Sequence, residues 1–291
     1  MGTIIETKEQ THLYSAGTPF EHTALHAVDF SAQAGEYVAV IGRTGSGKST
    51  LIQHLNGLLK PTSGQVLFDG ADIWESKERT RQVRCQVGLV FQYPEYQLFE
   101  ETVYQDIAFG PRNMELSKPE IDARVRRAAA FCGIEEAWLQ RSPFELSGGQ
   151  KRRVAIAGVL AMEPKLLVLD EPAAGLDPEG RDTILGQIKE YHRQTGATTV
   201  LVSHSMEDIA KFADKVLVLS GGRIAMYDDT DKVFARAPEL LELGLSVPEV
   251  TKIFLRLREM GLDIDTDVYT VKYAVKTILA ARAAKGGGTE C

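Results

Sequence analysis

Residues Gly42–Ser49 are the segment most capable of chemistry, because they match the pattern G-x-x-x-x-G-K-S/T. Glycines let the backbone fold closely around a phosphate, with several N–H groups pointing inward. A helix that begins at the lysine presents its positive end to the same anion. We therefore expect Lys48 to reach the β- and γ-phosphates of a nucleotide and the Ser49 hydroxyl to bind Mg²⁺.

The flanking residues support this interpretation. Tyr37–Ile41 is a short apolar run rich in β-branched residues, typical of a buried strand, and Ser49–Leu58 has leucines at helical spacing. The alternative is a glycine-rich turn that matches by accident, which a chain of this length produces about one time in a hundred. The residues expected to contact the nucleotide are Gly42, Thr44, Gly45, Ser46, Gly47, Lys48, Ser49 and Thr50.

A second apolar strand, Leu166–Leu169, ends in the two acids Asp170 and Glu171. Asp170 is placed to hold Mg²⁺ directly or through water. Glu171 is then placed to polarise an attacking water as a general base. By themselves these acids are equally explained as a solvated loop, so the assignment depends on the upstream phosphate loop. Guanine specificity is not expected, because the chain contains no N-K-x-D.

Leu146–Gln150 reads Leu-Ser-Gly-Gly-Gln and is a second helix start built like an anion site. Ser147 can cap the helix, and the glycines expose backbone N–H groups. An ordinary capped helix is the alternative, and it explains Ser147 but leaves Gly148, Gly149 and Gln150 without a reason. The basic triplet Lys151–Arg153 that follows predicts a solvated helix face or electrostatic support near phosphates, rather than a nucleic-acid patch on an acidic chain.

The elements that must position these residues follow an α/β pattern. Apolar runs separated by helix-like segments predict a parallel sheet, at 37–41, 87–91, 166–169, 199–202 and 216–219. Polar and apolar residues alternate at 4–13, 26–30 and 65–68, which indicates antiparallel strands beside that sheet. Strand signals vanish between about 101 and 162, where a helical insertion is expected, interrupted at Gly110-Pro111, Lys118-Pro119 and Ser142-Pro143.

Composition excludes several classes of protein. The 291 residues carry 33 Lys+Arg against 40 Asp+Glu, a formal charge of −7, which argues against a broad electrostatic grip on nucleic acid or anionic lipid. The cysteines, Cys85, Cys132 and Cys291, form neither a disulfide framework nor a CxxC metal site, as expected for a reducing cytosol. No stretch has the 18 or more apolar residues of a membrane helix, and the first residues lack the pattern of a signal peptide. A soluble protein is therefore expected, with any membrane role acting through a partner.

Taken together in this order, the motifs resemble those of an ATP-binding cassette (ABC) ATPase over roughly Ile4 to Asp231. Each five-residue match is weak, but the ordered set is very specific. In that family's terms the motifs are Walker A at 42–49, the Q-loop glutamine Gln92, the signature at 146–150, Walker B at 166–170 with Glu171, the D-loop at 174–177 and the switch histidine His204.

The resemblance extends to the ATPases of energy-coupling factor (ECF) transporters, which are relatives of the cobalt importer's ATPase. It is carried by the segments Phe91–Phe99 and Lys151–Leu160 and by the Ala-Gly-Leu-Asp D-loop. Tyr14 followed by Ala16–Glu21 resembles the second ATPase of group-II ECF complexes, although a Gly-Pro turn between two strands also explains this run.

The family resemblance implies a P-loop NTPase fold of the ABC type, with an antiparallel β-subdomain, a helical subdomain and a small C-terminal helical extension. It implies an ATPase domain at 1–234, whose helical subdomain spans about 101–162. Past Phe234 the composition changes, and apolar spacing predicts an extension at 235–284 with two amphipathic helices packed on the body. The small residues at 285–291 predict a disordered tail. The apolar stripes expected to pack are Val250, Ile253, Phe254 and Leu257, and then Val271, Ala274, Val275 and Ile278.

The resemblance also implies the roles of individual residues toward ATP and Mg²⁺. Ser147 and Gly149 would contact the γ-phosphate of a nucleotide held by a second ABC ATPase chain, and Asp177 would couple the two sites. Gln92 would sense Mg²⁺ and the attacking water, and His204 would hold the γ-phosphate. Tyr14 is the candidate for stacking on adenine, with Phe20 as the alternative.

The implied partners are a second ATPase chain, an integral membrane scaffold subunit and a substrate-binding membrane subunit, with no nucleic acid. The chain would then lie peripherally on the cytoplasmic face of the cell membrane. The aromatic and acidic stretch Tyr93–Glu101 is the candidate for receiving a coupling helix of the scaffold, with Glu95, Glu100 and Glu101 as candidate counterions for its arginine. Packing within the helical subdomain is the alternative for this stretch.

Two other functions compete with an ATPase that energises an importer of vitamins or transition-metal ions. A soluble ABC ATPase acting on nucleic acid or translation would carry long coiled-coil insertions or two cassettes in one chain, and the sequence has neither. A nucleotide-binding regulator without turnover is disfavoured because Gln92, Glu171 and His204 are all present. The sequence names neither the cargo nor whether the ATPase pair is a homodimer or a heterodimer.

Overall fold

Two β-sheets form the body of the chain, which the computed structural model describes from residue 2 to residue 286. The larger sheet has the strand order β10-β9-β3-β8-β7-β6 and the smaller one the order β2-β1-β4-β5. The strands are β1 (Thr3–Tyr14), β2 (His22–Gln33), β3 (Tyr37–Gly42), β4 (Ser63–Phe68), β5 (Ala71–Asp72), β6 (Val87–Val90), β7 (Leu166–Asp170), β8 (Thr198–Val202), β9 (Lys215–Ser220) and β10 (Arg223–Asp229).

The centre of the larger sheet is parallel, as the apolar runs predict. Strand β3 pairs in parallel with β8 and β9, and β7 pairs in parallel with β6 and β8. Every residue of β3, β7 and β8 is buried, which is why these strands are continuous apolar runs rather than alternating ones. The carboxyl ends of β3, β7 and β8 meet at one edge of this sheet, where ligands bind in open α/β folds.

Helices connect and cover these sheets. The α-helices are α1 (Lys48–Leu55), α2 (Lys77–Gln86), α3 (Val103–Asn113), α4 (Lys118–Phe131), α5 (Gly148–Leu160), α6 (Pro178–Thr195), α7 (Met206–Phe212), α8 (Thr230–Ala235), α9 (Ala237–Glu242), α10 (Glu249–Glu259) and α11 (Val271–Gly286). The short 3-10 helices are η1 (Pro94–Gln97), η2 (Glu136–Trp138) and η3 (Pro143–Glu145). Helix α1 ends at Leu55, about one turn before the predicted Leu58, because Asn56 caps it and Gly57 turns with φ of 70°.

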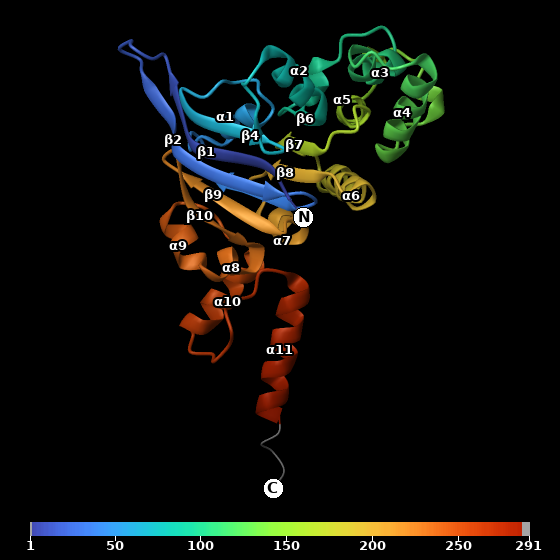
Figure 1. Ribbon diagram of the computed structural model, residues 1–291. Coiled ribbons are helices and arrows are strands. Elements are labelled where there is room, and N and C mark those ends of the chain that lie inside the picture. Colours follow the sequence, from blue (N-terminus) through green and yellow to red (C-terminus); the bar gives the residue numbers. More distant parts are fainter. Residues whose placement is uncertain (1, 287–291) are drawn as a thin grey trace.

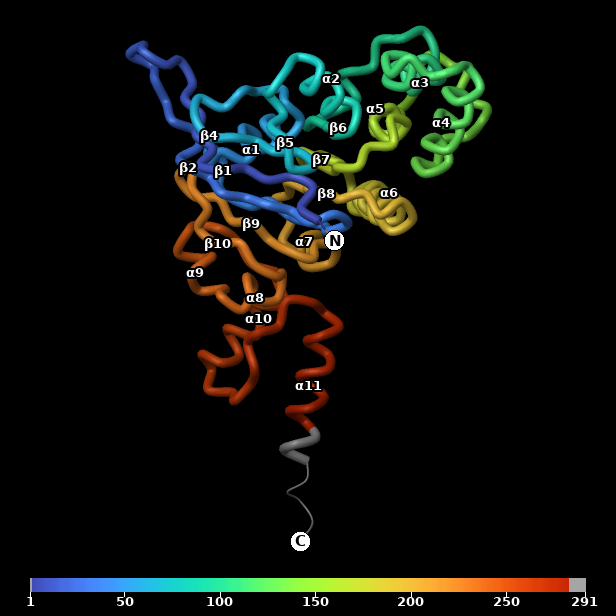
Figure 2. Tube along the Cα trace, in the orientation of Figure 1, coloured from blue at the N-terminus to red at the C-terminus, as the bar shows by residue number. Residues whose placement is uncertain are grey.

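The predicted helical insertion is present as α3, α4 and α5, which lie together at one side of the molecule (Figure 1). The hairpin turn between β1 and β2 projects at the opposite side (Figure 2). One expected interruption is wrong: Pro111 lies inside α3 instead of ending it. The other two mark helix starts, since Pro119 lies in the first turn of α4 and Pro143 in the first turn of η3.

The C-terminal region differs most from expectation. Helix α8 spans the expected domain boundary at 234, and its Val233 and Phe234 pack in one core cluster with Ile41 of β3. Helix α10 buries Phe254, but α11 extends away from the body (Figure 1). Of the stripe predicted to pack along α11, Ala274 is buried, whereas Val271, Val275 and Ile278 are exposed.

The sequence predicts a disordered tail at 285–291. Helix α11 continues through residues 285 and 286, while 287–291 lie outside the described residues. Across the part of the chain that the structure describes, no helix has the length and hydropathy needed to cross a bilayer.

Candidate functional site

A cavity of about 560 Å³ at the carboxyl edge of the parallel strands collects most of the residues that the sequence singles out. They arrive from separate segments of the chain: the end of β1, the loop before α1, the segment after β6, the end of β7 and the segment after β8. The predicted residues that line this cavity are Tyr14, Thr44, Gly45, Gly47, Lys48, Ser49, Thr50, Gln92, Asp170, Glu171 and His204. We call this the nucleotide cavity.

The phosphate loop has the shape that its glycines permit. Gly47 has φ of 102°, and a Cβ there would lie 2.6 Å from the carbonyl oxygen of Ala24. Gly42 and Ser46 do not line the cavity. A Cβ on Gly42 would lie 2.4 Å from Ser46 Oγ, and the Ser46 N–H donates to the Arg43 carbonyl oxygen at 3.0 Å. These two residues therefore shape the loop from within.

Lys48 lies in the first turn of α1 with its ammonium group held at the loop. Its Nζ donates to the carbonyl oxygens of Gly42 at 2.7 Å and Arg43 at 3.1 Å. Burial lowers the pKa of Lys48 below its usual value, and the nearby carboxylates of Glu171 and Asp170 oppose that shift. The side chain is a buried cation beside two acids, and phosphate oxygens are suitable further partners for its donors.

The cavity wall also carries a donor set that fits Mg²⁺. Ser49 and Asp170 both line this wall. Burial raises the pKa of Asp170, while the nearby Ser49 hydroxyl, Lys48 and His204 oppose the rise. Gln92 lines the same cavity. Mg²⁺ prefers oxygen ligands and at nucleotide sites is held by one or two carboxylates with phosphate oxygens and water, so one carboxylate with a hydroxyl and an amide oxygen fits it. Within residues 2–286 there is no group of three or more His, Cys, Asp or Glu side chains that could hold a metal ion.

Glu171 is held in an unusual conformation directly after β7. Its φ of 48° lies in the left-handed region, and its N–H donates to the Val202 carbonyl oxygen of β8 at 3.0 Å. Its Oε1 lies 2.7 Å from Nε2 of His204. The neighbouring ends of β7 and β8 thus bring the expected general base and the expected switch histidine into contact.

A separate cavity of about 300 Å³ holds the other predicted residues, Ser147, Gly149 and Asp177. Ser147 and Gln150 form a reciprocal capping box at the start of α5, with N–H donations of 3.3 and 2.9 Å. Capping therefore explains Gln150 as well as Ser147, which the sequence argument did not expect. Asp177 also caps a helix, since it accepts the Gly180 N–H at 2.9 Å.

Capping does not explain the two glycines at this helix start. Neither Gly148 nor Gly149 has a positive φ, and a Cβ on either would meet no described atom within 4 Å. Neither the backbone conformation nor packing within this chain therefore requires a glycine there. The start of α5 has no side chains at Gly148 and Gly149, so another molecule can approach its backbone closely. We call these two residues the bare helix start.

Arg152 is not on a solvated helix face, contrary to the expectation for the basic triplet. It is 3% exposed, and its guanidinium donates to both carboxylate oxygens of Glu95 at 2.9 and 2.6 Å. It also donates to the carbonyl oxygen of Ala174 at 2.6 Å. Burial acts to raise the pKa of Glu95, but hydrogen bonds from Arg152 outweigh it and hold that pKa below its usual value. One side chain thus joins α5 to η1 and to the loop after β7.

We expect Arg152→Met to lower the free energy of unfolding by about 3–5 kcal/mol, because it leaves the Glu95 carboxylate buried without a partner. The double variant with Glu95→Gln should recover part of this loss. Urea unfolding measures both. Arg193→Met is the control, since its ion pair with Glu190 is exposed to solvent and its loss should change the free energy of unfolding far less. An Arg152 effect as small as the control would contradict the structural role of this pair.

Two residues that line the nucleotide cavity were missed, His22 and Ala24. Both lie on β2, and the antiparallel register places His22 directly opposite Tyr14. The sequence feature that could have found them is the Gly-Pro turn between the two strands. It implies a hairpin, and therefore a residue on the second strand that faces Tyr14. The alternative aromatic residue, Phe20, lies in that turn, 84% exposed, and does not line the cavity.

A buried histidine pair lies beside the cavity, and sequence reasoning did not find it. His54 of α1 is fully buried, and its Nε2 lies 3.1 Å from Nδ1 of His12 on β1. Burial lowers the pKa of His54 from 6.5 to about 4; a hydrogen bond to the Thr50 carbonyl opposes this, and the neighbouring His12 adds to it. Burial likewise lowers the pKa of His12. Both rings are therefore neutral near pH 7.

Because the folded protein keeps His54 neutral, the unfolded chain binds more protons between pH 6.5 and about 4. The free energy of unfolding should then fall by about 3 kcal/mol as the pH is lowered through that window. Urea titrations from pH 7 to 4 on the wild type and on His54→Gln measure this contribution as a difference. Parallel pH profiles in the two proteins would contradict it.

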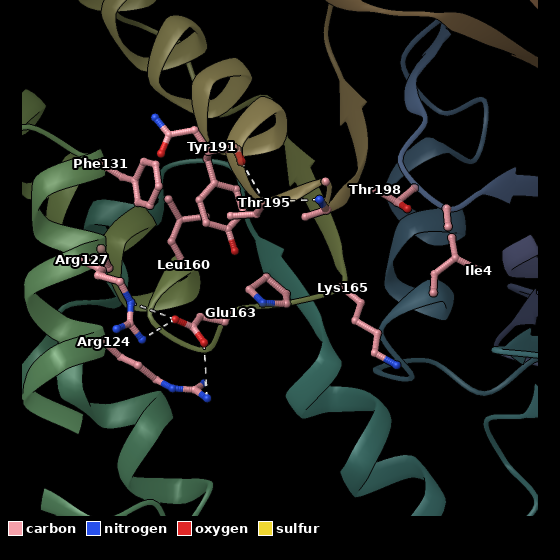
Figure 3. Close-up of a pocket in the computed structure, with 16 residues that line it drawn as sticks. Ile4, Arg124, Arg127, Phe131, Leu160, Glu163, Lys165, Tyr191, Thr195 and Thr198 are labelled. Atoms are coloured by element: carbon pink, nitrogen blue, oxygen red, sulfur yellow. Dashed lines mark hydrogen bonds and ion pairs between the residues drawn. The ribbon is translucent and has the colours of Figure 1, made fainter. Parts of the chain in front are cut away.

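Another cavity, of about 510 Å³, lies between α4, the end of α6 and the segment leading into β7 (Figure 3). Arg124 and Arg127 of α4 both pair with Glu163 at its rim. None of the residues predicted to bind nucleotide or metal lines it. The predicted chemistry is thus confined to the nucleotide cavity and the bare helix start.

Known proteins resemble this chain over most of its length. The profile of the ABC transporter family matches residues 25–174. The energy-coupling factor transporter ATP-binding protein EcfA2 of Clostridium acetobutylicum is 54% identical over 276 residues, which cover 94% of this chain and 96% of that protein. The protein of the same name from Clostridium tetani is 52% identical over 276 residues, with 94% and 96% coverage.

Solved structures agree with these relatives. The structure of cbiO1 from Clostridium perfringens, part of the ABC transporter complex cbiONQ, has a TM-score of 0.74 at 40% identity and covers 90% of this chain and 98% of that one. The ATP-binding cassette MJ0796, as a post-hydrolysis dimer with ADP and Pi, has a TM-score of 0.70 at 27% identity, with 78% and 99% coverage. The chain therefore belongs to the ABC transporter family, as an ATPase of the energy-coupling factor type.

Proposed function

We propose that the chain binds Mg²⁺ and ATP in the nucleotide cavity. It hydrolyses the bond between the β- and γ-phosphates with Glu171 as general base. The observation that carries this proposal is the meeting of Lys48, Asp170 and Glu171 at one cavity wall, each supplied by the end of a buried strand or the start of the helix after it. Lys48 holds the β- and γ-phosphates, and Ser49, Asp170 and Gln92 are the Mg²⁺ ligands. Bound Mg²⁺ neutralises charge that develops on the phosphate oxygens.

Glu171 and His204, which follow strands β7 and β8, have different roles in this site. Glu171 accepts a proton from the attacking water, and His204, in contact with it, orients the reaction at the γ-phosphate. Tyr14 stacks on the base. The contact of 2.7 Å between Glu171 and His204 supports these roles because it holds the carboxylate in one orientation.

The second cavity completes the site of another ATPase chain. Ser147 and Gly149 contact the partner's γ-phosphate, and Asp177 couples the two sites. The bare glycines at the start of α5 support this, since nothing within the chain requires them. Closure of the pair is favourable only when γ-phosphate bridges both halves, so hydrolysis reopens it.

The membrane partner docks on an exposed aromatic surface beside Gln92. This surface consists of Tyr93, Tyr96, Phe99 and Phe109, which are 42%, 84%, 59% and 42% exposed. Aromatic anchors with charged rims are typical of protein interfaces. The predicted acids around it differ: Glu95 is bound by Arg152 and Glu100 by Arg112, while Glu101 is exposed with no ion pair among the described residues. Glu101 is therefore the counterion for the scaffold's arginine.

We expect Glu101→Lys to reduce recovery of the membrane scaffold with the tagged chain by about tenfold, because like charges at an interface are strongly unfavourable. Glu242→Lys, an equally exposed acid on α9, is the control and should leave recovery unchanged. Affinity purification from detergent-solubilised membranes followed by mass spectrometry measures both. Normal assembly of the Glu101 variant would contradict the assignment.

The complete proposal is an ATPase held at the cytoplasmic face of the membrane by a scaffold subunit and paired with a second ATPase chain. A separate membrane subunit selects the cargo, which is a vitamin or a transition-metal ion. The test is purification from membranes: co-isolation of an integral membrane scaffold and a second ATPase supports the proposal. Co-isolation of ribosomes or DNA instead would support the soluble ABC ATPase.

A further inference from the structure

The buried histidine pair connects two parts of the nucleotide cavity that lie far apart in sequence. His12 and Tyr14 are two residues apart on β1, so both side chains point to the same side of the strand. Thr50 and His54 are four residues apart on α1, so they share one face of the helix. These two pairs meet where the end of β1 passes α1.

The contacts among the four side chains form a closed circuit. The Tyr14 hydroxyl lies 3.2 Å from Thr50 Oγ1, and the His54 Nδ1 lies 2.7 Å from the Thr50 carbonyl oxygen. The His12 and His54 rings meet edge to face with centroids 4.7 Å apart, joined by their 3.1 Å hydrogen bond. The His12 and Tyr14 rings also meet edge to face, with centroids 4.5 Å apart.

The chemistry of the partners determines where the protons lie. A carbonyl oxygen only accepts, so Nδ1 of His54 carries a hydrogen and donates it to Thr50. Nε2 of this neutral ring is then an acceptor, and Nδ1 of His12 must donate to it. The hydrogen bonds of the two histidines therefore fix their tautomers, and the His12 ring is held by its bond to His54 while it meets Tyr14 edge to face.

Tyr14 differs from the other three residues of the circuit in its exposure to solvent. His12, Thr50 and His54 are each at most 8% exposed, whereas Tyr14 is 39% exposed and faces the nucleotide cavity. The exposed Tyr14 ring thus rests on two histidines that do not line the cavity and on Thr50, which is buried at the cavity wall. Thr50 directly follows Ser49 of the phosphate loop, so the same circuit joins the base side of the cavity to its phosphate side.

We propose that His12 and His54 are positioning residues that hold the Tyr14 ring for stacking on the nucleotide base, in register with the phosphate loop. This inference rests on the proposed role of Tyr14. It assigns no contact with ATP to either histidine, and both act through Tyr14 and Thr50.

The test separates binding of the base from binding of the phosphates. The probes are Mg-ATP and magnesium tripolyphosphate, titrated by calorimetry into the purified full-length chain. His12→Leu replaces the ring with an apolar side chain of similar size and so removes the hydrogen-bond donor to His54. We expect its Kd for ATP to rise about tenfold, because stacking on an aromatic ring is a large part of base affinity. Its Kd for tripolyphosphate should stay within about twofold of the wild type.

Conservative variants keep the test decisive if the leucine variant folds poorly. His12→Asn places an amide N–H where Nδ1 lies and should recover ATP affinity to within about threefold of the wild type. His12→Gln places its amide where Nε2 lies and should behave like His12→Leu. His192→Leu is the control, since that ring bonds the Ala197 carbonyl oxygen and meets the Tyr37 ring edge to face, away from Tyr14 and the nucleotide cavity. It should change neither Kd.

A double variant tests whether His12 acts through Tyr14. Tyr14→Ala should weaken ATP binding and spare tripolyphosphate, and adding His12→Leu should then cost nothing more. Additive losses, equal losses for both ligands, or an unchanged Kd for ATP in His12→Leu would each overturn the inference. Failure of the wild type to bind either ligand would instead overturn the nucleotide site itself.

Discussion

Glu171→Gln is expected to reduce the rate of ATP hydrolysis by about 10²–10⁴-fold while leaving ATP binding intact. Glutamine preserves the size of the side chain and can still contact His204, but it cannot accept a proton from the attacking water. Because hydrolysis is what reopens the closed pair, the variant should accumulate as an ATP-bound dimer. Steady-state phosphate release and size-exclusion chromatography with Mg-ATP measure the two effects.

The matched control for this experiment is Glu190→Gln, which makes the same chemical change on the exposed surface of α6. It should hydrolyse ATP at the wild-type rate. Near-normal hydrolysis by Glu171→Gln would remove Glu171 from the role of general base. A monomeric variant that binds ATP without turnover would keep the base and contradict the closed pair.

Lys48→Ala is expected to raise the Kd for Mg-ATP by at least about 100-fold and to abolish turnover at millimolar ATP. Its ammonium group is a buried cation whose donors point into the phosphate loop. Hydrogen bonds to charged groups are each worth about 1.5–3 kcal/mol, so loss of those to two phosphates accounts for an effect of this size. Calorimetric titration with ATP and with tripolyphosphate measures the loss, which should be equal for both ligands.

Lys118→Ala, an exposed lysine at the start of α4, removes the same charge away from the cavity and should bind ATP normally. A Lys48→Ala protein that binds ATP as tightly as this control would show that the phosphate loop is misassigned. Loss of ATP affinity with unchanged tripolyphosphate affinity would place Lys48 at the base instead. The two Kd values thus locate the lysine along the nucleotide.

The residues proposed for catalysis could be located from the sequence because they lie in short contiguous segments. The phosphate loop follows a buried strand and opens a helix, and Asp170 and Glu171 end another buried strand. In a parallel sheet such strand ends meet at one edge, so their order along the chain was enough to predict that Lys48 and Asp170 share a cavity. The fold class follows from the same alternation of apolar runs and helical segments.

Contacts between distant segments were decided by the tertiary structure. Tyr14 rather than Phe20 lines the cavity because the hairpin register carries the strand end over α1 and leaves the turn in solvent. Arg152 looked like a surface charge, but α5 packs it against Glu95, which lies 57 residues earlier in the chain. Local periodicity holds no information about which partner a buried charge will meet.

At the C-terminal helix α11, apolar spacing predicted more burial than the structure has. The apolar spacing of Val271, Ala274, Val275 and Ile278 predicts a helix, and α11 forms there. Spacing states only that one face is apolar, whereas burial requires a second surface within reach, and α11 leaves the body with most of that face exposed. Local order in the sequence thus located the residues proposed to bind phosphate and metal. The position of Tyr14 in the cavity, the buried ion pair and the exposed helix depended on how remote segments pack.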